Sequence, residues 1–346
     1  MQTKFPEIGK ATVLDNDKKR LLICAFGFED RSLAWTNFQR GNKILTDAYV
    51  IKYQNPKGKN KLIELKKNLK EIGVAKPIEQ NYDVLGQNNI EATIEEYLKN
   101  INDLYDEIIL DITAMTKFLI LIFLCKLEIF EGFVRIIYAE ADEYAPTEEE
   151  YNKFRDKVKK VIRFPSRGFG TILRAKCLSS IRMQGQPVAL VAFTSFNEQL
   201  VRHMLGTISP HLLIFINGAP PREEYRWREK ATMTLHSKLI AEYPIDNEIN
   251  EEGMLNRAAS TMDYREAIAC IDDIYTKIGL RERIIIAATG SKMQTVGLFF
   301  AKIKHSDVHI EYPTPDSYYI KGFSSGCKNI YEVEFSEYKC FINNLS

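Results

Sequence analysis

The sequence predicts an α/β protein built from two tandem open parallel sheets, each with helices on both faces. Two observations support this fold class. Apolar, strand-like runs alternate with longer helical patterns, and such alternation implies parallel strands joined by right-handed crossovers. In addition, three segments of the first half recur in the same order in the second half. Such a recurrence indicates a tandem duplication.

Each recurring segment begins with an apolar strand, and the segments differ in the residues after this strand. The first continues with Ala-Phe, a polar turn and a helical pattern. The second continues with a turn that contains threonine and lysine and then an apolar helix, and the third ends in Tyr-x-x-x-Asp-x-Tyr. In order, the pairs occupy residues 21–35 and 188–205, 107–127 and 283–303, and 134–144 and 308–318. Both halves are therefore predicted to form Rossmann-like sheets.

The residues between these segments continue the alternation. Strands are expected at residues 47–53 and 211–218, and helices at residues 60–73, 89–103, 222–243 and 254–279. Gly73 and Gly279 are expected to close two of these helices. The apolar run from Phe118 to Phe130 is interrupted by charged residues and is too short to span a bilayer. It predicts a buried core helix.

The domain boundaries are predicted from a change in composition near the middle of the chain. Residues 165–186 are rich in Gly, Arg and Ser, which is typical of a linker. We therefore expect a first domain at residues 1–164 and a second at residues 187–346. Residues 318–335 are expected to form a C-terminal β-hairpin.

Composition and charge exclude several classes of protein. The 346 residues include 47 Lys+Arg and 46 Asp+Glu, for a net charge of +1. This balance argues against broad nonspecific nucleic-acid binding but leaves room for a locally basic pocket. The first ten residues lack an apolar signal core, and the six cysteines form no C-x-x-C pair. We expect a cytoplasmic protein with no membrane segment and no disulfides.

The sequence contains no recognisable metal or cofactor motif. The five histidines show no H-x-x-x-H or H-E-x-x-H spacing, so a zinc hydrolase is not indicated. The chain also lacks the phosphate-binding motif G-x-x-x-x-G-K-[ST] and the nucleophile motif G-x-S-x-G. We therefore expect neither a metal site nor a resident cofactor.

The repeated turns are the candidate site, because open parallel sheets bind ligands at the carboxyl ends of their strands. The strongest candidate for a binding site is the turn Ala-Thr-Gly-Ser-Lys-Met in the second half, which leads into a helix. Its hydroxyls, its glycine, its lysine and the positive helix end suit a phosphate or another anion. The alternative is an ordinary helix cap beside a tight turn. The residues concerned are Thr289, Gly290, Ser291, Lys292 and Met293.

The equivalent turn of the first half contains Thr113, Thr116 and Lys117, but alanine replaces the glycine and Asp111 precedes the turn. An aspartate at a strand end can be a general base, a metal ligand or a ribose hydroxyl acceptor. It can equally cap the following helix. These alternatives remain open in the sequence.

The turn after the first strand of each half differs in charge. In the first half it contains Gly27, Phe28, Glu29 and Arg31. Arginine suits bidentate phosphate contact, although Glu29 and Arg31 can simply pair at the surface. The corresponding residues of the second half are neutral hydrogen-bonding groups, namely Thr194, Ser195 and Asn197.

The third pair of turns adds two aspartates and four tyrosines. Tyrosine rings can stack on a nucleotide base, or they can merely cover the edge of the sheet. The residues are Asp142, Tyr138 and Tyr144 in the first half, and Asp316, Tyr312 and Tyr318 in the second.

The segment ATGSKMQTVGLFFAKI resembles the strand–turn–helix motif of CRISPR-associated Rossmann-fold (CARF) domains. The resemblance implies that this turn, together with the turn after the first strand, contacts a cyclic oligonucleotide. It also implies paired domains, so a fused pair like that of the related SAVED sensor domains would look like this duplication. The first half departs from the motif at Asp111 and Ala114, so symmetric ligand binding is not expected.

Two functions of different classes are consistent with these observations. The first is a nucleotide sensor in antiviral defence, which binds its ligand at the turns and alters the packing of the two halves or of an associated effector protein. The expected partners are an effector protein or further copies of the same chain. The second is an enzyme that cleaves a phosphodiester, as ring nucleases do, or a glycosidic bond. Its catalytic residues would be Glu29, Arg31, Asp111 and Lys117. A scaffold that only holds a partner protein is a third possibility.

Overall fold

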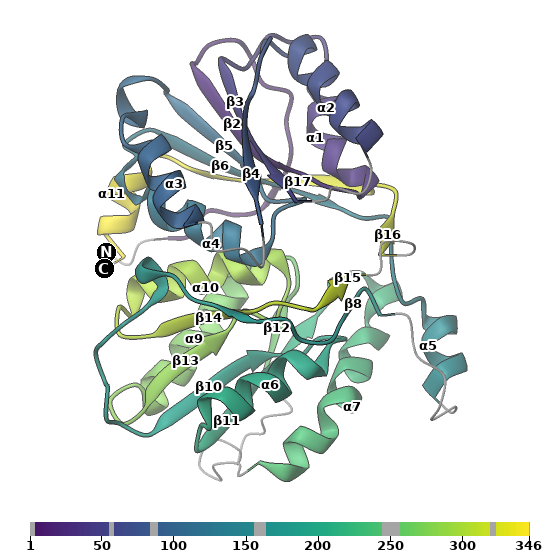
Figure 1. Ribbon diagram of the computed structural model, residues 1–346, viewed down its shortest axis with the longest axis vertical. Helices are drawn as coiled ribbons and strands as arrows, with labels where there is room; N and C mark the ends of the chain where they lie inside the picture. The colour runs from purple at the N-terminus through teal and green to yellow at the C-terminus, as the bar shows by residue number, and fades with distance from the viewer. Residues whose placement is uncertain are drawn as a thin grey trace. The chain divides into compact units, whose positions relative to one another are not determined.

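The computed structural model describes residues 4–54, 59–83, 89–155, 164–243, 257–318 and 323–345 (Figure 1). The chain forms two compact units. The first unit comprises Met1–Tyr144 and Gly322–Leu345, and the second comprises Ala145–Lys321. Each unit contains a mainly parallel sheet with helices on both faces. The predicted α/β fold is therefore confirmed.

The sheet of the first unit has five parallel strands in the order β6-β5-β2-β3-β4. Two antiparallel strands extend it at the β6 edge, where β17 pairs with β6 and β1 pairs with β17. The strands are β1 (Gly9–Lys10), β2 (Arg20–Phe26), β3 (Asp47–Tyr53), β4 (Ile78–Tyr82), β5 (Glu107–Asp111), β6 (Phe133–Glu140) and β17 (Asn329–Phe335).

Helices α1 (Ala34–Phe38) and α2 (Lys59–Glu71) cover one face of this sheet, and α3 (Ile90–Leu98) and α4 (Lys117–Lys126) cover the other (Figure 1). Alternate strand residues face the two layers, as the pleat requires. The expected core helix is confirmed, because every residue from Phe118 to Cys125 is buried. The chain turns sharply after α2 at Gly73, which has a positive φ of 118°.

The sheet of the second unit repeats this order. Its parallel strands are β10 (Val188–Phe193), β11 (Leu212–Ala219), β12 (Ala258–Ser260), β13 (Arg283–Ala287) and β14 (His309–Pro313). They lie in the order β14-β13-β10-β11-β12, so each strand has the place of its counterpart in the first unit. An antiparallel strand, β9 (Ile172–Leu173), pairs with β14. The helices are α6 (Glu198–Ile208), α7 (Trp227–Glu242), α9 (Tyr264–Ile278) and α10 (Lys292–Lys304).

Several short elements complete the two units. Two small antiparallel pairs join β7 to β16 and β8 to β15. The short elements are β7 (Glu143–Tyr144), β8 (Ser166–Arg167), β15 (Ser317–Tyr318), β16 (Ser324–Ser325), α5 (Glu148–Arg155), α11 (Tyr338–Asn343) and the 3₁₀ helices η1 (Asp30–Leu33), η2 (Ile101–Asp103), η3 (Leu127–Ile129), η4 (Lys176–Leu178) and η5 (Glu223–Tyr225).

The C-terminal segment differs from the expected β-hairpin. Residues 319–322 lie outside the described residues, and the strands around them do not pair with each other. Instead β15 pairs with β8, whereas β16 and β17 pair with β7 and β6 of the first unit. The C-terminal segment therefore belongs to the first unit, and the expected linker at 165–186 contains β8 and β9 of the second. The bounds of both units thus differ from the expected domain boundaries.

The helix expected at residues 254–279 is wrong at its start. Residues 254–256 lie outside the described residues, and Ala258–Ser260 forms strand β12, which pairs with β11. Helix α9 begins only after Asp263, whose carboxylate accepts a hydrogen bond from the backbone N–H of Arg265 at 2.9 Å. A carboxylate at this position is a preferred helix cap, and it sets the observed helix start.

Buried charges connect the amino ends of three strands in the first unit. The carboxylate of Glu107 on β5 is fully buried. It accepts hydrogen bonds from Arg20 Nε on β2 at 2.6 Å and from Arg135 Nε on β6 at 2.7 Å. Arg135 also forms ion pairs with Glu332 and Glu334 on β17. This ion network therefore holds the antiparallel strand β17 against the parallel strands.

The second unit contains a carboxylate whose titration should affect stability. Glu311 on β14 accepts hydrogen bonds from Arg174 Nε at 2.6 Å and lies 3.2 Å from His309 Nε2. Burial raises the pKa of Glu311, but His309 and Arg174 lower it more, so the pKa lies below its ordinary value of 4.5. A lowered folded-state pKa contributes stability above pH 4.5, which is lost as the pH falls through that pKa.

We therefore expect Glu311→Gln to destabilise the protein by about 1–3 kcal/mol at neutral pH and by less in acid. Urea denaturation at several pH values measures this difference. Glu242→Gln is the control, because Glu242 is an exposed partner of Arg202 and should change stability little at any pH. An effect of Glu311→Gln that does not shrink in acid would contradict the proposed linkage.

Candidate functional site

The turn after β2 contains a buried ion pair. Arg31 Nε donates to Glu29 Oε1 at 2.9 Å, and their exposed fractions are 3% and 8%. Arg31 Nη1 also donates to the Tyr138 hydroxyl at 3.0 Å and to the Ala139 carbonyl at 2.9 Å. These contacts engage most of the guanidinium donors. Arg31 therefore fixes the turn to the end of β6, and the pair is not the surface pair that the sequence left open.

The turn after β5 connects to the same contacts. Asp111 Oδ1 accepts a hydrogen bond from the Thr113 N–H at 2.9 Å, and Thr113 Oγ1 accepts one from the Ala139 N–H at 2.9 Å. Since Arg31 binds the Ala139 carbonyl, one chain of contacts runs from Asp111 to Arg31. Thr116 caps α4 by accepting from the Leu119 N–H. The first unit therefore brings its predicted acidic and basic residues to one edge of its sheet.

A cysteine and a tyrosine at this edge are held in their neutral forms. Burial, followed by the charge of Asp111, raises the pKa of the Cys24 thiol, so Cys24 does not supply a thiolate nucleophile at neutral pH. Burial also raises the pKa of Tyr144 well above its ordinary value. The hydroxyls of Tyr138 and Tyr144 lie 3.2 Å apart, so both tyrosines take part in the packing of the turn.

The turn after β13 caps a helix, which is one of the two roles that the sequence left open. Ser291 caps α10: its hydroxyl accepts from the Gln294 N–H at 3.1 Å, and the Gln294 side chain accepts from the Ser291 N–H at 2.8 Å. Thr289 Oγ1 accepts from the Phe193 N–H at 3.0 Å and is buried. Met293 is buried in the core, whereas Lys292 is half-buried. The surface of this turn therefore consists mainly of Gly290, Ser291 and Lys292.

Close backbone approach explains why the glycine of this turn is absent from the first half. A Cβ atom at Gly290 would lie 2.9 Å from Phe193 Cγ, at the end of β10. In the first unit the glycine lies in the other of the two turns, the one after β2. A Cβ atom at Gly27 would lie 2.7 Å from the Cβ of Ala114, which lies in the turn after β5. Each unit thus needs one glycine where these turns meet.

The turn after β10 contains a neutral hydrogen-bond network. Thr194 Oγ1 donates to Asn217 Oδ1 at 2.5 Å and lies 3.2 Å from Thr232 Oγ1. Asn197 Nδ2 donates to the Gly168 carbonyl at 3.1 Å. Ser195 is half-buried beside Asn197 and accepts from its N–H. This network replaces the buried charges of the first unit.

The third pair of turns is closed by residues that the sequence interpretation missed. A Cβ at Gly326 would lie 3.1 Å from Asp142 Cβ, and one at Gly168 would lie 2.9 Å from Asp316 Cβ. Both glycines have a positive φ, of 62° and 64°. The hydroxyls of Tyr312 and Tyr318 lie 3.4 Å apart, as in the first unit. A weak signal was present, because Phe-Pro-Ser-Arg-Gly at 164–168 resembles Phe-Ser-Ser-Gly at 323–326.

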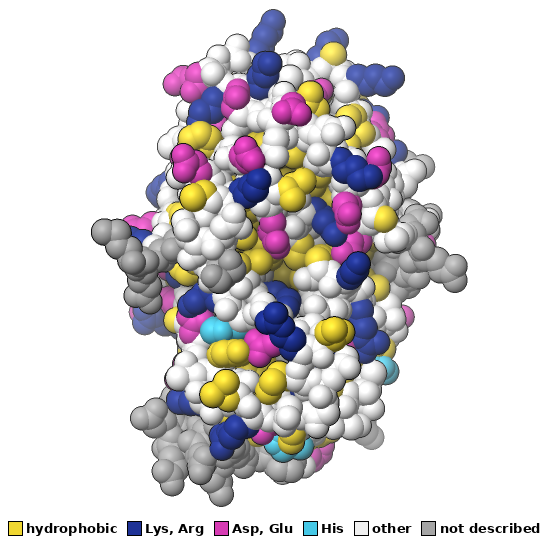
Figure 2. Space-filling view, turned by 90° about the vertical axis from the view of Figure 1, so that its left-hand side faces the viewer, with side chains coloured by type: hydrophobic (Ala, Val, Ile, Leu, Met, Phe, Trp, Pro, Cys, Tyr) yellow, Lys and Arg dark blue, Asp and Glu magenta, His cyan; other side chains and the backbone are white. Residues whose placement is uncertain are grey.

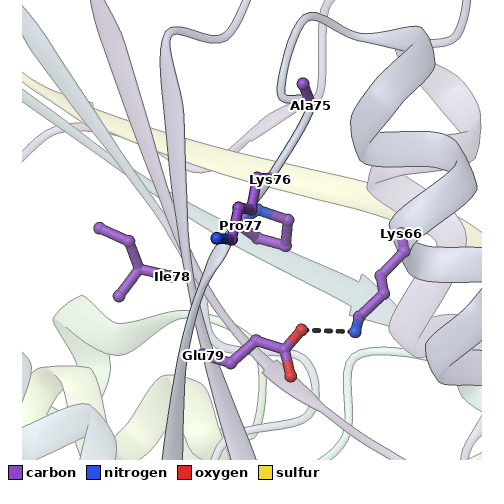
Figure 3. Close-up of a pocket in the computed structure, with 6 residues that line it drawn as sticks. All are labelled: Lys66, Ala75, Lys76, Pro77, Ile78 and Glu79. Atoms are coloured by element: carbon purple, nitrogen blue, oxygen red, sulfur yellow. Dashed lines mark ion pairs between the residues drawn. The ribbon is translucent and has the colours of Figure 1, made fainter.

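Two surface pockets lie away from these turns. One of about 580 Å³ is lined by Lys66 and residues 75–79, at the amino end of β4 (Figure 3). There Lys66 Nζ lies 2.5 Å from Glu79 Oε1. A second, of about 230 Å³, is lined by residues that include Arg182, Tyr275 and His305. None of the residues of the candidate turns lines either pocket.

The described residues contain no group of three His, Cys, Asp or Glu side chains arranged to hold a metal ion. Within the same part of the chain, no helix has the length and apolar character needed to cross a membrane. On the face drawn in Figure 2, Lys and Arg side chains are interspersed with Asp, Glu and hydrophobic ones. Any attraction of an anion is therefore expected to be local, as the net charge of +1 indicates.

Comparisons with known proteins give limited similarity. No protein-family model matches the chain, and no curated protein matches it. Among solved structures, the chain is similar to a type III CRISPR defence DNA nuclease activated by cyclic oligoadenylate. The TM-score is 0.49 at 10% identity, over 89% of this chain and 68% of the nuclease. It is also similar to a functionally unknown protein from Pseudomonas aeruginosa PAO1, with a TM-score of 0.25 at 11% identity, over 86% of this chain and 92% of that one.

Proposed function

We propose that the protein is a nucleotide sensor that binds a cyclic oligonucleotide, or a related nucleotide signal, at the carboxyl ends of its sheet strands. One observation supports this proposal above the others. In both units one strand, β5 or β13, leads into an apolar helix. The first residue of this helix is a half-buried lysine, Lys117 in α4 and Lys292 in α10. A hydroxyl cap, Thr116 or Ser291, precedes each lysine. A lysine at a helix amino end suits a phosphate.

The two units are expected to contribute unequally. Asp111 places a buried carboxylate before the turn of the first unit, whereas Ala287 occupies that place in the second. A carboxylate near a phosphate opposes binding. We therefore propose that the turn formed by Gly290, Ser291 and Lys292 makes the stronger phosphate contacts. The resemblance to CARF domains, which rests on this same turn, supports antiviral defence as the setting and an effector protein as the partner.

Calorimetric titration with cyclic and linear oligoadenylates tests this proposal. We expect a cyclic oligonucleotide to bind with a Kd of about 1 μM or tighter, and to be recovered chemically unchanged after incubation. Linear oligonucleotides of the same length test whether the ring is recognised. If no cyclic or linear nucleotide in such a series bound, the sensor function would be contradicted.

A second candidate function, phosphodiester or glycosidic-bond cleavage, is supported by the contacts that connect Asp111, Glu29 and Arg31. The informative variant is Asp111→Asn. The amide oxygen can still accept from the Thr113 N–H, so we expect a stability change of less than about 1 kcal/mol. For a sensor, the variant should bind its ligand at least as tightly as the wild type, because a negative charge has been removed.

Product analysis by chromatography separates the two functions. Turnover by the wild-type protein that disappears in Asp111→Asn, with ligand affinity retained, would establish the enzyme. The control is Asp106→Asn at the other end of β5, where the carboxylate also accepts a backbone hydrogen bond, from the Lys19 N–H at 2.8 Å. If both variants lost turnover equally, the loss would reflect damage to the fold and not acid–base chemistry.

A further inference from the structure

Each unit is closed by a short segment that runs antiparallel to its last parallel strand. The first-unit ribbon, residues 323–335, contains β16 and β17, which pair with β7 and β6. The second-unit ribbon, residues 164–173, contains β8 and β9, which pair with β15 and β14. The two ribbons therefore occupy equivalent places in the two sheets.

The contacts of the ribbons with the first turn of each unit also match. Phe323 meets Phe28 edge to face, with ring centroids 5.5 Å apart, and Phe164 meets Phe196 with centroids 5.4 Å apart. The next contact is polar in both units. Ser324 Oγ donates to Glu29 in the first unit, and Asn197 Nδ2 donates to Ser166 Oγ in the second.

A positive-φ glycine completes each set, since Gly326 packs against Asp142 and Gly168 against Asp316. The agreement therefore extends from strand pairing to one ring contact, one polar contact and one glycine on each side. Such agreement is typical of a duplicated structural element.

The order of the ribbons along the chain does not match the units that they close. Along the chain, the second-unit ribbon comes after β6 and β7 of the first unit, and the first-unit ribbon comes after β14 and β15 of the second unit. Each sheet is thus followed in sequence by the ribbon of the other.

We propose that folding of the second unit stabilises the first. The second unit, Ala145–Lys321, lies in one continuous stretch between the two parts of the first unit. Unfolding of the second unit therefore lengthens the flexible connection between β7 and the first-unit ribbon, and a longer flexible connection lowers the effective concentration of the ribbon at its pairing site. Loss of the ribbon would then expose the β6 edge and remove the contact between Ser324 and Glu29. The second-unit ribbon has no such dependence, because it lies within the continuous stretch of its own unit. The proposal does not depend on a ligand.

The test combines a perturbation outside the ribbons with loosened ribbons, in the full-length chain. Gly41→Ala in the first unit and Gly185→Ala in the second are suitable perturbations, because both glycines have a positive φ and open space around them. The ribbons are loosened together by Gly168→Ala and Gly326→Ala. Pulse-labelling hydrogen exchange along a urea titration gives a separate unfolding midpoint for each unit, from peptides of β2 and of β10.

In the wild-type background, we expect Gly185→Ala to lower both midpoints, by roughly 0.5 M urea, and Gly41→Ala to lower the midpoint of the first unit alone. With loosened ribbons, Gly185→Ala should lower the midpoint of the second unit alone. If the loosened protein does not fold, Ser166→Ala with Ser324→Ala provides a milder pair. The proposal is wrong if Gly185→Ala affects the second unit alone in the wild type, or both units after loosening.

Discussion

Replacement of Glu107 by glutamine is expected to destabilise the first unit by about 3–5 kcal/mol. The carboxylate is 0% exposed, and each of its oxygens accepts a hydrogen bond from a buried arginine, Arg20 or Arg135. Glutamine has nearly the same shape, but it removes the negative charge and turns one acceptor into a donor that faces a guanidinium. Two buried positive charges would then lose their shared partner, which costs far more than a surface ion pair contributes.

Glu334→Gln provides the matched control for this effect. Glu334 also pairs with Arg135, but its side chain is 42% exposed. We expect this substitution to cost less than about 1 kcal/mol, because solvent screens the pair. Urea denaturation followed by hydrogen exchange in β2 and β5 measures both variants in the same unit. Similar losses in the two variants would show that burial of Glu107 does not determine the energy of this network.

Much of the fold could be predicted because its strands are buried in the centres of sheets. Every residue of β2 and β5 is buried, so both read as apolar runs in the sequence. The edge strand β4 was missed because its segment, Ile-Glu-Gln-Asn-Tyr, is mostly polar. Strand β12 is only three residues long and was absorbed into a helical pattern. Edge strands carry little hydrophobic signal, since only one side of each is paired.

The partners of the C-terminal strands could not be predicted for a different reason. Strand β17 pairs with β6, and Arg135 reaches Glu334 across 199 residues of sequence. A hairpin was the natural expectation, because neighbouring strands in sequence usually pair. Nothing in the local pattern shows which distant sheet edge is open. That information lies in the positions of all the other strands.

The candidate turns were located correctly as the ends of sheet strands, but the environment of their side chains was not predictable. Glu29 and Arg31 lie two residues apart, and this spacing suits an exposed pair as well as a buried one. Their burial depends on Tyr138 and Ser324, which come from distant segments. In the same way, the absence of glycine at Ala114 was interpreted as divergence, whereas Gly27 supplies the close approach from the opposite turn.

Replacement of Lys292 by alanine is expected to weaken nucleotide binding by about 10- to 100-fold, provided that the proposed sensor function holds. A hydrogen bond between a charged donor and a phosphate contributes about 1.5–3 kcal/mol. Lys117→Ala should have a smaller effect, because Asp111 opposes an anion at that turn. Calorimetry at low and moderate salt measures both variants, and the salt dependence of binding should decrease in Lys292→Ala.

The control for these variants lies at the other end of each helix. Lys304 is the last residue of α10 and pairs with Asp272, and Lys126 is the last residue of α4 and pairs with Glu91 and Glu95. Alanine at either position removes the same charge from the same helix, but at its carboxyl end. We therefore expect Lys304→Ala and Lys126→Ala to bind the nucleotide as the wild type does. If Lys292→Ala and Lys304→Ala weakened binding equally, the attraction would arise from overall charge and not from the turn after β13.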